Sequence, residues 1–325
     1  MKLSKKINNS SLSIIVILII SMFLLQGCTG NSAPIRIGTN AWPPCEIWQI
    51  AEQQGYFGKV PVDIIRFSSW SDNMSALYKG NINITHATYF NAVYYHDKGI
   101  PARIILSSDV IEGSDGLVVK NNITSGPDLK GKVIAVEINT DEHFLLKKAL
   151  DNFGLSEDEV IIQSATSFES MQLFIDGKVD ACFTYDPFLH QAAEEGEGRI
   201  FWTTLDLPDY MIDVLVADDQ TLTSRKKDLK IIIQAWYKAQ EFIKNNKEEA
   251  FSILAATEGM SAEDFEAFYN SFTFFSAKEN LDIFSSPSFE AKLEEMNEFL
   301  FLHGAIRNKA DVKNIFSLDI IQELQ

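Results

Sequence analysis

The stretch that decides the fold runs from residue 125 to 150 and reads SGPDLKGKVIAVEINTDEHFLLKKAL. Residues 132–137 form a short apolar run that predicts a buried strand, and Asn139 and Thr140 can cap a helix that follows it. Apolar residues then recur at helical spacing as far as Gly154, a residue type that suits a helix end. A strand followed directly by an amphipathic helix is the repeating unit of an α/β protein.

The same alternation extends on both sides of this stretch. It continues to Asp218 and predicts an α/β protein with two mixed, mostly parallel sheets, whereas the chain after Asp218 is mostly helical. The predicted strands are 35–38, 62–67, 83–88, 103–107, 116–119, 132–137, 160–163, 179–184, 199–203 and 211–217. The predicted helices include 46–54, 72–78, 167–175, 224–245, 247–257, 261–270 and 286–303.

A polar loop at 121–130 marks a boundary inside the α/β region. One strand leads into the middle unit and one leads out, so we expect a first lobe that is interrupted by a second. The predicted lobes are 35–118, 119–214 and a mostly helical return of the first lobe at 215–325. Two crossover strands would join the lobes, with hinges near Val118–Lys120 and Asp213–Leu215.

Residues 1–27 have the layout of a secretory signal. Three lysines precede an apolar run at 12–25, which is too short for a comfortable membrane span. The sequence LLQGC at 24–28 is similar to a bacterial lipobox, which implies that Cys28 is lipidated and becomes the first mature residue. Residues 28–34 would then be a tether, and the protein an extracytoplasmic, membrane-anchored lipoprotein. The alternative is an uncleaved anchor helix with an incidental cysteine.

The composition excludes several classes of protein. The 325 residues are 46% apolar and 22% charged, an ordinary globular balance that argues against disorder. The formal net charge is −17 and no basic run occurs, so nucleic acid is not an expected partner. Three cysteines are too few for a disulfide scaffold, and neither CxxC, HExxH nor GxSxG occurs.

Four strings in order resemble solute-binding proteins of ABC importers in the nitrate, sulfonate and taurine class. IRIGTNAWPPCEIWQIAEQQGYF at 35–57 is similar to their start, and 125–150, with DLKGK at 128–132, is similar to the opening of their second lobe. IDGKVDACFTYDPF at 175–188 and YMIDVLVADDQ at 210–220 are similar to later family segments. The family also contains thiamine-pyrimidine proteins, some of them enzymes with a cysteine-rich motif that does not occur here.

The resemblance implies a two-lobed periplasmic-binding-protein fold of type II, with no catalysis and no cofactor. A small molecule would be trapped between the lobes by hinge closure and passed to an ABC permease. A monomer is the default for this fold class. Two other functions stay open: a ligand-sensing module that feeds a membrane receptor, and an extracytoplasmic enzyme that acts on a small heteroaromatic.

The binding residues are expected where strands end, because ligands of open α/β sheets bind beyond the carboxyl ends of the strands, near helix N-termini. The predicted ligand-binding residues are Asn40, Trp42, Pro43, Glu46, Trp70, Asp72, Thr88, Tyr89, Asn139, Thr140, His143, Tyr185, Asp186 and Asp213. Asn91 and Glu142 lie in the same strand-end segments, and Asp115, like Asp213, lies near a predicted crossover. Several have simpler interpretations: Asp72 as a helix cap, Glu46 and Glu142 as partners of a helix dipole, and Asp186 as a helix start.

The predicted site is aromatic and acidic and contains neither lysine nor arginine. Aromatic faces attract cations and stack on flat rings, and uncompensated carboxylates oppose an anion. The ligand is therefore expected to be an amine or a nitrogen heterocycle rather than an inorganic anion. Five histidines, at 86, 96, 143, 190 and 303, show no ligand spacing, so no metal is expected. Cys45 and Cys182 are expected to be free, partly buried thiols.

Overall fold

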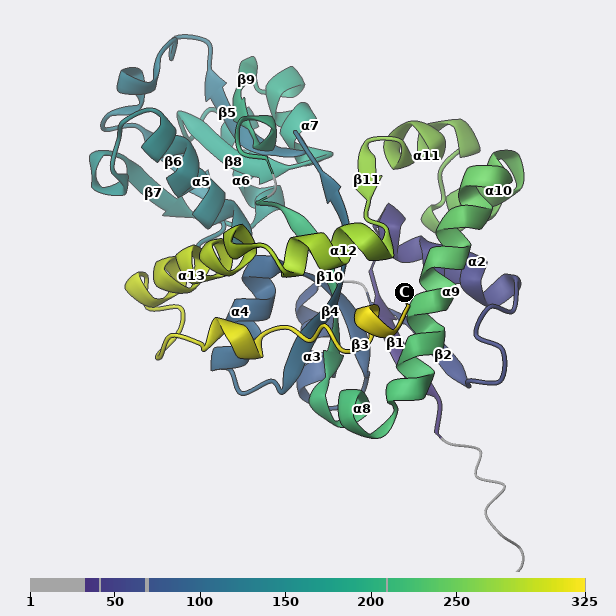
Figure 1. Ribbon diagram of the computed structural model, residues 1–325. Coiled ribbons are helices and arrows are strands. Elements are labelled where there is room, and N and C mark those ends of the chain that lie inside the picture. Colours follow the sequence, from purple (N-terminus) through teal and green to yellow (C-terminus); the bar gives the residue numbers. More distant parts are fainter. Residues whose placement is uncertain (1–32, 41, 68–69, 209, 325) are drawn as a thin grey trace, which may run out of the picture. The chain divides into compact units, whose positions relative to one another are not determined.

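The computed structural model describes residues 33–40, 42–67, 70–208 and 210–324 (Figure 1). Residues 1–34 form a unit separate from residues 35–325, and the two described residues of that unit lie in no helix or strand. The predicted signal segment at 1–27 and Cys28 lie outside the described residues. None of the described helices is both long and apolar enough to cross a membrane.

The first sheet has six strands in the order β11-β4-β10-β3-β1-β2. Its strands are β1 (Ile35–Thr39), β2 (Val62–Arg66), β3 (Ile84–Thr88), β4 (Ala102–Ile111), β10 (Ile212–Asp218) and β11 (Phe272–Phe274). Strand β1 pairs in parallel with β2 and β3, whereas β10 runs antiparallel to both β3 and β4. The parallel strands β1 and β3 therefore end at the same edge of the sheet.

The second sheet has five strands in the order β7-β6-β8-β5-β9. Its strands are β5 (Asp115–Lys120), β6 (Val133–Val136), β7 (Ile161–Ser164), β8 (Ala181–Tyr185) and β9 (Gly198–Thr203). Strand β6 pairs in parallel with β7 and β8, and β5 runs antiparallel to β8 and β9. Both sheets thus combine a parallel half with an antiparallel half, so the predicted mixed α/β class is confirmed, but the prediction that the sheets are mostly parallel is wrong, because β10, β4, β11, β5 and β9 pair antiparallel.

The chain passes between the sheets at residues 112–114 and again at 204–211. These crossings differ from the predicted hinges at 118–120 and 213–215. Val118 pairs with Cys182 inside the second sheet, so that segment is held in a ladder and is not a connection. The crossings fall where ladders end, and the Gly113 amide at the first donates to Thr204 Oγ1 at the second, 2.8 Å away.

Short helices follow the strands, as the apolar periodicity predicts. Those that precede β10 are η1 (Pro43–Glu46), α2 (Ile47–Gln53), α3 (Trp70–Tyr78), α4 (Tyr89–Asp97), η2 (Gly126–Leu129), α5 (Asp141–Asn152), η3 (Glu157–Glu159), α6 (Ser167–Ile175), α7 (Phe188–Glu195) and η4 (Thr204–Asp206). Helices α3 and α4 pack on the first sheet, and α5, α6 and α7 on the second. Helix α4, between β3 and β4, was not predicted.

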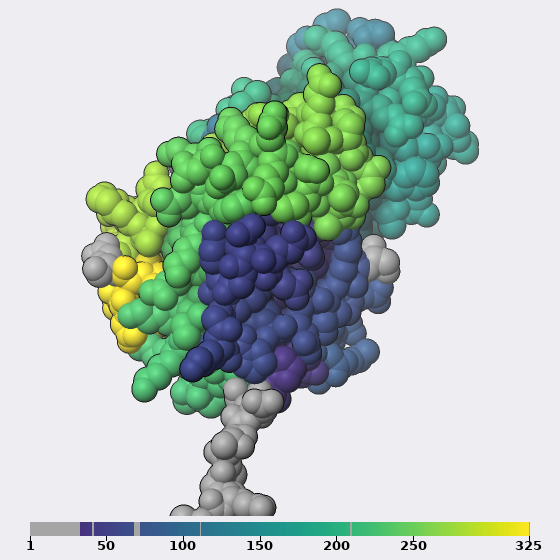
Figure 2. Space-filling model, turned by 90° about the vertical axis from the view of Figure 1, so that its right-hand side faces the viewer, coloured from purple at the N-terminus to yellow at the C-terminus, as the bar shows by residue number. Residues whose placement is uncertain are grey.

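The return is helical, as expected, with one exception. Its helices are α8 (Asp219–Ser224), α9 (Lys226–Asn245), α10 (Lys247–Glu258), α11 (Ala262–Tyr269), α12 (Ala277–Phe284), α13 (Pro287–Leu302), η5 (Val312–Asn314) and η6 (Ile321–Leu324). The exception is β11, whose three residues pair with β4 at the sheet edge. Figure 2 shows the face on which α10 and α11 pack beside η1 and α2. The first two helices belong to the return, whereas η1 and α2 follow the first strand of the chain.

The core of the first sheet is closed by the return. The apolar stripe of α9 that the sequence shows, Ile232, Trp236, Ala239 and Ile243, is buried. Trp236 contacts Trp48 of α2 with ring centroids 4.9 Å apart. Helix α9 packs against α2, although the two helices are distant in sequence. The return therefore holds in place the segment that follows β1.

Candidate functional site

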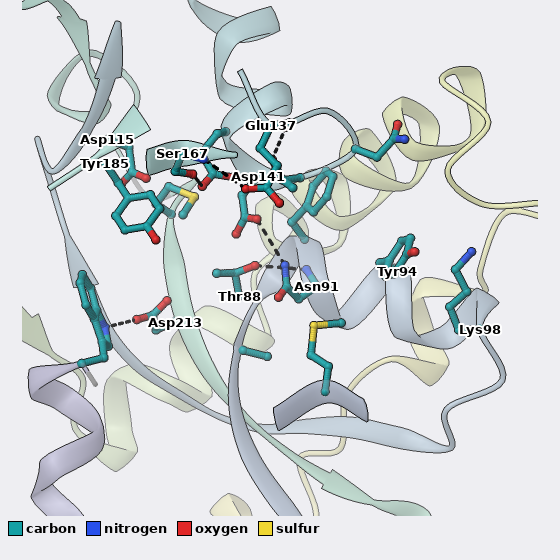
Figure 3. A pocket seen from close by; sticks show the side chains of 18 of the residues that line it. Thr88, Asn91, Tyr94, Lys98, Asp115, Glu137, Asp141, Ser167, Tyr185 and Asp213 are labelled. Carbon is teal, nitrogen blue, oxygen red and sulfur yellow. Dashed lines mark hydrogen bonds between the residues drawn. The ribbon is translucent and has the colours of Figure 1, made fainter. Parts of the chain in front are cut away.

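A cavity of about 740 Å³ opens at the carboxyl ends of β1, β3, β6 and β8, with walls from both sheets (Figure 3). Its size suits a small organic molecule. Its lining consists of Trp42, Met74, Ser75, Tyr78, Ala87, Thr88, Phe90, Asn91, Tyr94, Lys98, Ile100, Ser114, Asp115, Glu137, Asn139, Thr140, Asp141, Glu142, Ser167, Tyr185, Met211 and Asp213. The strand-end rule therefore locates the cavity correctly.

Six of the predicted ligand-binding residues lie together in this lining: Trp42, Thr88, Asn139, Thr140, Tyr185 and Asp213. Asn91, Asp115 and Glu142, from the same predicted segments, lie there too. Two of the six also have a structural role. Thr88 caps α4, its Oγ1 accepting the Asn91 amide, and the Thr140 hydroxyl donates to the Glu137 carbonyl.

Trp42 and Asp213 form one wall of the cavity. The Trp42 indole N–H donates to Asp213 Oδ2 over 2.9 Å, as Figure 3 shows. The edges of Phe268 and Phe272, from α11 and β11, hold the indole at centroid distances of 5.7 and 5.2 Å. The helical return, distant in sequence, thus fixes an aromatic face that looks into the cavity.

Asp213 stands beside a second buried acid. It pairs in register with Asp109 across the antiparallel ladder of β10 and β4. Burial, reinforced by the charge of Asp109, raises the pKa of Asp213 well above its ordinary value. Burial also raises the pKa of Asp109 to about 7. Two close, desolvated carboxyls cannot both ionise easily.

The opposite wall carries four more carboxyls from the second sheet and its helices, those of Asp115, Glu137, Asp141 and Glu142. Asp115 accepts the Ser114 hydroxyl at 2.9 Å, and Glu142 accepts the Ser167 hydroxyl at 3.0 Å. Burial, the largest cause in both, raises the pKa of Asp115 to about 7 and that of Glu142 to about 8.

Asp141 and Tyr185 extend the same wall. Asp141 accepts the side-chain amide of Asn91 over 3.4 Å, which links α5 of the second sheet with α4 of the first. Burial raises the pKa of Asp141 as well. Burial, with the charge of Glu142 as the next cause, raises the pKa of Tyr185 to about 12, so its hydroxyl stays protonated and available as a donor.

Three predicted residues after β1 lie outside the lining, because η1 and α2 turn their side chains into the interior. Asn40 is buried and its Oδ1 accepts the side-chain amide of Asn73 at 2.6 Å. Pro43 is buried at the first position of η1. Glu46 is buried against Arg66, 2.5 Å away, and burial raises its pKa to about 7.

Five more predicted residues also lie outside the lining. Tyr89 is 1% exposed and its hydroxyl bonds Ser107 at 2.8 Å, because it points into the sheet from the first turn of α4. Asp186 bonds the ring and amide of His190 one turn later. Asp72 is exposed on the first turn of α3, and the side chain of Trp70, which begins that helix, lies outside the described part of the structure.

His143, the last of these, has a partner that the sequence did not reveal. Its Nε2 lies 2.9 Å from Glu157 Oε1, and Glu157 Oε2 lies 2.9 Å from His303 Nε2. The expectation that the histidines do not converge is therefore wrong for His143 and His303. Imidazole nitrogens of both rings and a carboxylate oxygen of Glu157 lie within 4.8 Å of one another. Cys45 and Cys182 are free, as predicted, but fully buried.

Several lining residues were missed. Ser167 begins α6 after β7 and could have been found by the strand-end rule, and Asp141 follows the predicted cap Thr140. Phe90, Tyr94 and Lys98 lie four residues apart on α4 and its end, so their common face could be read only once that helix was recognised. Lys98, the one basic residue of the lining, lies with Nζ 3.2 Å from the Ala305 carbonyl and over the Tyr94 ring.

Curated relatives are similar in sequence to this chain over part or most of its length. The taurine-binding periplasmic protein of Escherichia coli is 24% identical over 152 residues, which cover 46% of this chain and only 48% of that relative. A Brucella abortus protein described as a candidate binding protein is 21% identical over 304 residues, covering 91% of this chain and 94% of its own.

Solved structures show the same fold. The periplasmic aliphatic sulphonate binding protein of Escherichia coli superposes with a TM-score of 0.73 at 17% identity, covering 88% of this chain and 92% of that chain. The desulfurization enzyme DSZB gives a TM-score of 0.63 at 14% identity, covering 90% and 98%. The predicted periplasmic-binding-protein fold is thereby confirmed, and the fold is shared by a binding protein and an enzyme. Residues 29–257 match the model of the NMT1-like family, and the chain belongs to that family.

Proposed function

We propose that this protein is the solute-binding component of an ABC importer and holds a small organic molecule in the cavity between its two sheets. The observation that carries the proposal is a cavity of about 740 Å³ whose walls come from strand ends of both sheets. A ligand there touches both walls at once, so binding favours the arrangement in which the walls are close. The relatives named for taurine and sulfonate binding support the same role.

The ligand, in this proposal, is an amine or a nitrogen heterocycle. The lining carries five carboxyls, Asp115, Glu137, Asp141, Glu142 and Asp213, and a single lysine. A cation or a ring N–H group gives the carboxylates the counter-charge or donors that the protein does not supply. The aromatic faces of Trp42 and Tyr185 add attraction of about 0.5–2 kcal/mol each for a cation.

Lys98 does not change this preference. It lies apart from Asp213 and Tyr185 in Figure 3, and its ammonium group already donates one hydrogen bond to the Ala305 carbonyl. A sulfonate or nitrate placed between Trp42 and Tyr185 would instead face Asp115 and Asp213. An inorganic anion is therefore the less favoured ligand despite the names of the relatives.

Calorimetry at pH 8 tests the ligand class with choline, 4-aminopyrimidine, taurine, ethanesulfonate and nitrate as probes. We expect heat of binding with choline or 4-aminopyrimidine and none with ethanesulfonate or nitrate. Affinity should fall at pH 6, because the cavity carboxyls with pKa values of about 7 and 8 then hold protons. Tight binding of nitrate or ethanesulfonate without any binding of the nitrogen compounds would contradict the proposal.

Recovery of the bound probe separates binding from turnover. The fold is shared with a desulfurization enzyme, so an activity has to be sought directly. The thiol of Cys45, three residues after Trp42 of the lining, is 1% exposed, and burial raises its pKa well above the ordinary value. A nucleophile needs the opposite environment. We expect the probe to return chemically unchanged in stoichiometric amount, and conversion would favour an enzyme.

Lipid anchoring belongs to the same proposal and rests on the lipobox-like LLQGC at 24–28. The Cys28→Ser variant should leave the membrane fraction, whereas the unchanged protein should stay in it and carry a lipid detectable by mass spectrometry. Retention of the variant in the membrane fraction would favour an uncleaved anchor helix.

A further inference from the structure

Outside the cavity lining, three ionisable side chains meet where α5 and η3 of the second sheet contact the end of α13. His143, 4% exposed, and His303 both bond Glu157, whose two oxygens each lie 2.9 Å from one imidazole Nε2. The two rings stand nearly perpendicular, at 78°, with centroids 5.1 Å apart. The proposed function does not use this cluster.

The protons of His143 follow from its neighbours. The Asn139 amide donates to His143 Nδ1 over 3.2 Å, so this nitrogen carries a lone pair. A neutral imidazole has one N–H and one lone pair, so the proton is on Nε2 and is donated to Glu157 Oε1. His143 therefore connects Glu157 to the backbone of a residue in the cavity wall.

The protons of His303 follow in the same way. Its Nδ1 lies 2.9 Å from the carbonyl oxygen of Phe299, which can only accept, so Nδ1 donates. Its Nε2 faces Glu157 Oε2, and the bonds from the histidines lower the pKa of Glu157 to about 2, so that oxygen also only accepts. Both nitrogens of His303 must donate, which makes the ring an imidazolium.

We propose that His143, Glu157 and His303 form a proton-dependent clasp in which the imidazolium of His303 holds Glu157, and Glu157 orients His143 to fix Asn139 in the cavity wall. Asn139 has a φ of 63°, in the left-handed region that non-glycine residues seldom adopt. The hydrogen bond from the backbone N–H of Asn139 to His143 Nδ1 helps to hold that conformation. These three are positioning residues, and the clasp acts whatever ligand the cavity takes.

A metal site is the competing interpretation of the same atoms. Two imidazole nitrogens and a carboxylate are ordinary zinc ligands. Zinc would need a lone pair on Nε2 of both rings, but the Asn139 amide already uses the lone pair of His143 Nδ1 and leaves the proton on Nε2. Protons satisfy every nitrogen and oxygen of the cluster, and zinc would break one of these bonds.

Other charged groups surround the clasp and are mostly paired with one another. The Lys148–Glu295 ion pair joins α5 to α13 at 2.6 Å without touching the clasp. The other charged residues and histidines on η3, α4, α5, α13 and the segment after it are Asp158, Glu159 with Lys130, His96, Asp97 with Lys98, the cavity acids Asp141 and Glu142, Lys147 with Asp151, Glu290, Lys292, Glu294, Glu298 with Lys309, Arg307 and Asp311.

Nitrogen-15 NMR of the histidine rings tests the clasp without any ligand. At pH 6 we expect His143 to be neutral with its proton on Nε2 and His303 to carry two protons. In spectra recorded at increasing pH, any loss of a proton from the His303 ring should coincide with faster hydrogen exchange of the Asn139 amide, after correction for intrinsic exchange. A His143 proton on Nδ1, or a neutral His303 at pH 6, would overturn the proposal.

A matched pair of variants tests the positioning role. Glu157→Gln should speed exchange of the Asn139 amide by up to about tenfold, because it replaces one of the two accepting oxygens by a donating NH2 group and removes the negative charge that both histidines bind. Glu295→Gln breaks the neighbouring ion pair between the same helices and should leave that amide unchanged. Equal effects of the two variants, or none from Glu157→Gln, would assign the cluster a structural role only. If added Zn²⁺ in stoichiometric amount shifts both Nε2 signals of the unchanged protein, the cluster is a metal site and the clasp is wrong.

Discussion

Carboxylates in two regions of this molecule have opposite properties. At the surface, Asp128 accepts the backbone amides of Thr124 and Ser125, and these bonds lower its pKa to about 2. Glu169 and Glu279 cap their helices in the same way, and their pKa values are lowered too. Each of these acids has donors supplied by its own helix end, so its charge is satisfied within a few residues of sequence.

In the cavity the same chemical group is left short of donors. Asp115 accepts the Ser114 hydroxyl and Glu142 the Ser167 hydroxyl, yet burial outweighs these bonds and raises their pKa values to about 7 and about 8. Asp213 has the indole N–H of Trp42 and a second acid, Asp109, beside it. The comparison teaches that the surface acids are satisfied within the fold, whereas burial opposes the charge of the cavity acids, which we propose is balanced by a ligand that brings positive charge.

The largest expected effect comes from replacing one cavity acid. Asp213→Asn still accepts the indole N–H of Trp42 but, unlike the acid, cannot give up a proton to become the counter-charge of a bound cation, so the affinity for choline at pH 8 should fall roughly 10- to 100-fold. Calorimetry measures the change. The control is Asp176→Asn, which removes a charge from the exposed end of α6 and should leave affinity unchanged. If the Asp213→Asn variant binds choline as tightly as the unchanged protein, the claim that cavity acids bind the ligand and surface acids do not is contradicted.

The second prediction concerns stability of the empty protein against pH. A buried acid whose folded pKa is raised binds its proton more tightly in the folded state, so stability should fall as pH rises from about 4 to about 8. For Asp115 the loss is at most about 4 kcal/mol. Denaturant unfolding across this range measures it, and Asp115→Asn should flatten the curve. Stability that rises over the same interval would mean that the cavity acids are already satisfied.

The third prediction probes the surface region alone. Ser276→Ala removes the hydroxyl that caps α12 and should lower the free energy of unfolding by about 1 kcal/mol. Choline binding should not change, because α12 contributes no residue to the cavity lining. Thermal unfolding and calorimetry on the same variant check both statements, and a loss of affinity would show that the two regions are coupled.

The smallest expected effect is at the one basic residue of the lining. Lys98→Gln should change choline affinity less than about threefold, because the ammonium group is exposed and bonded to the Ala305 carbonyl. If the ligand were an anion held by Lys98, the same variant would abolish its binding. A pronounced loss of affinity for taurine in this variant would favour that alternative.

Much of the site could be predicted because strand ends are local features. The apolar runs that mark β1, β3, β6 and β8 place Trp42, Thr88, Asn139 and Tyr185 at one edge. The rule locates the backbone but not the side chain. Successive helix residues differ by about 100° in direction, so Tyr89 turns into the core while its neighbour Thr88 lines the cavity.

Contacts between distant segments could not be predicted in this way. Glu157 and His303 are 146 residues apart, and no local pattern brings them together. The same holds for Phe268 and Phe272, which hold Trp42 from a helix and an edge strand of the return. The β11 strand was missed because its three residues gain stability from pairing with β4 and not from their own sequence.

Mass spectrometry of whatever copurifies with the native protein tests the central claim most directly. The account predicts a small molecule, released by denaturation in stoichiometric amount, that contains a basic nitrogen or a nitrogen heterocycle and is absent from the Asp213→Asn variant. A nitrate or a sulfonate without a basic nitrogen, retained in the same amount by both proteins, would contradict it.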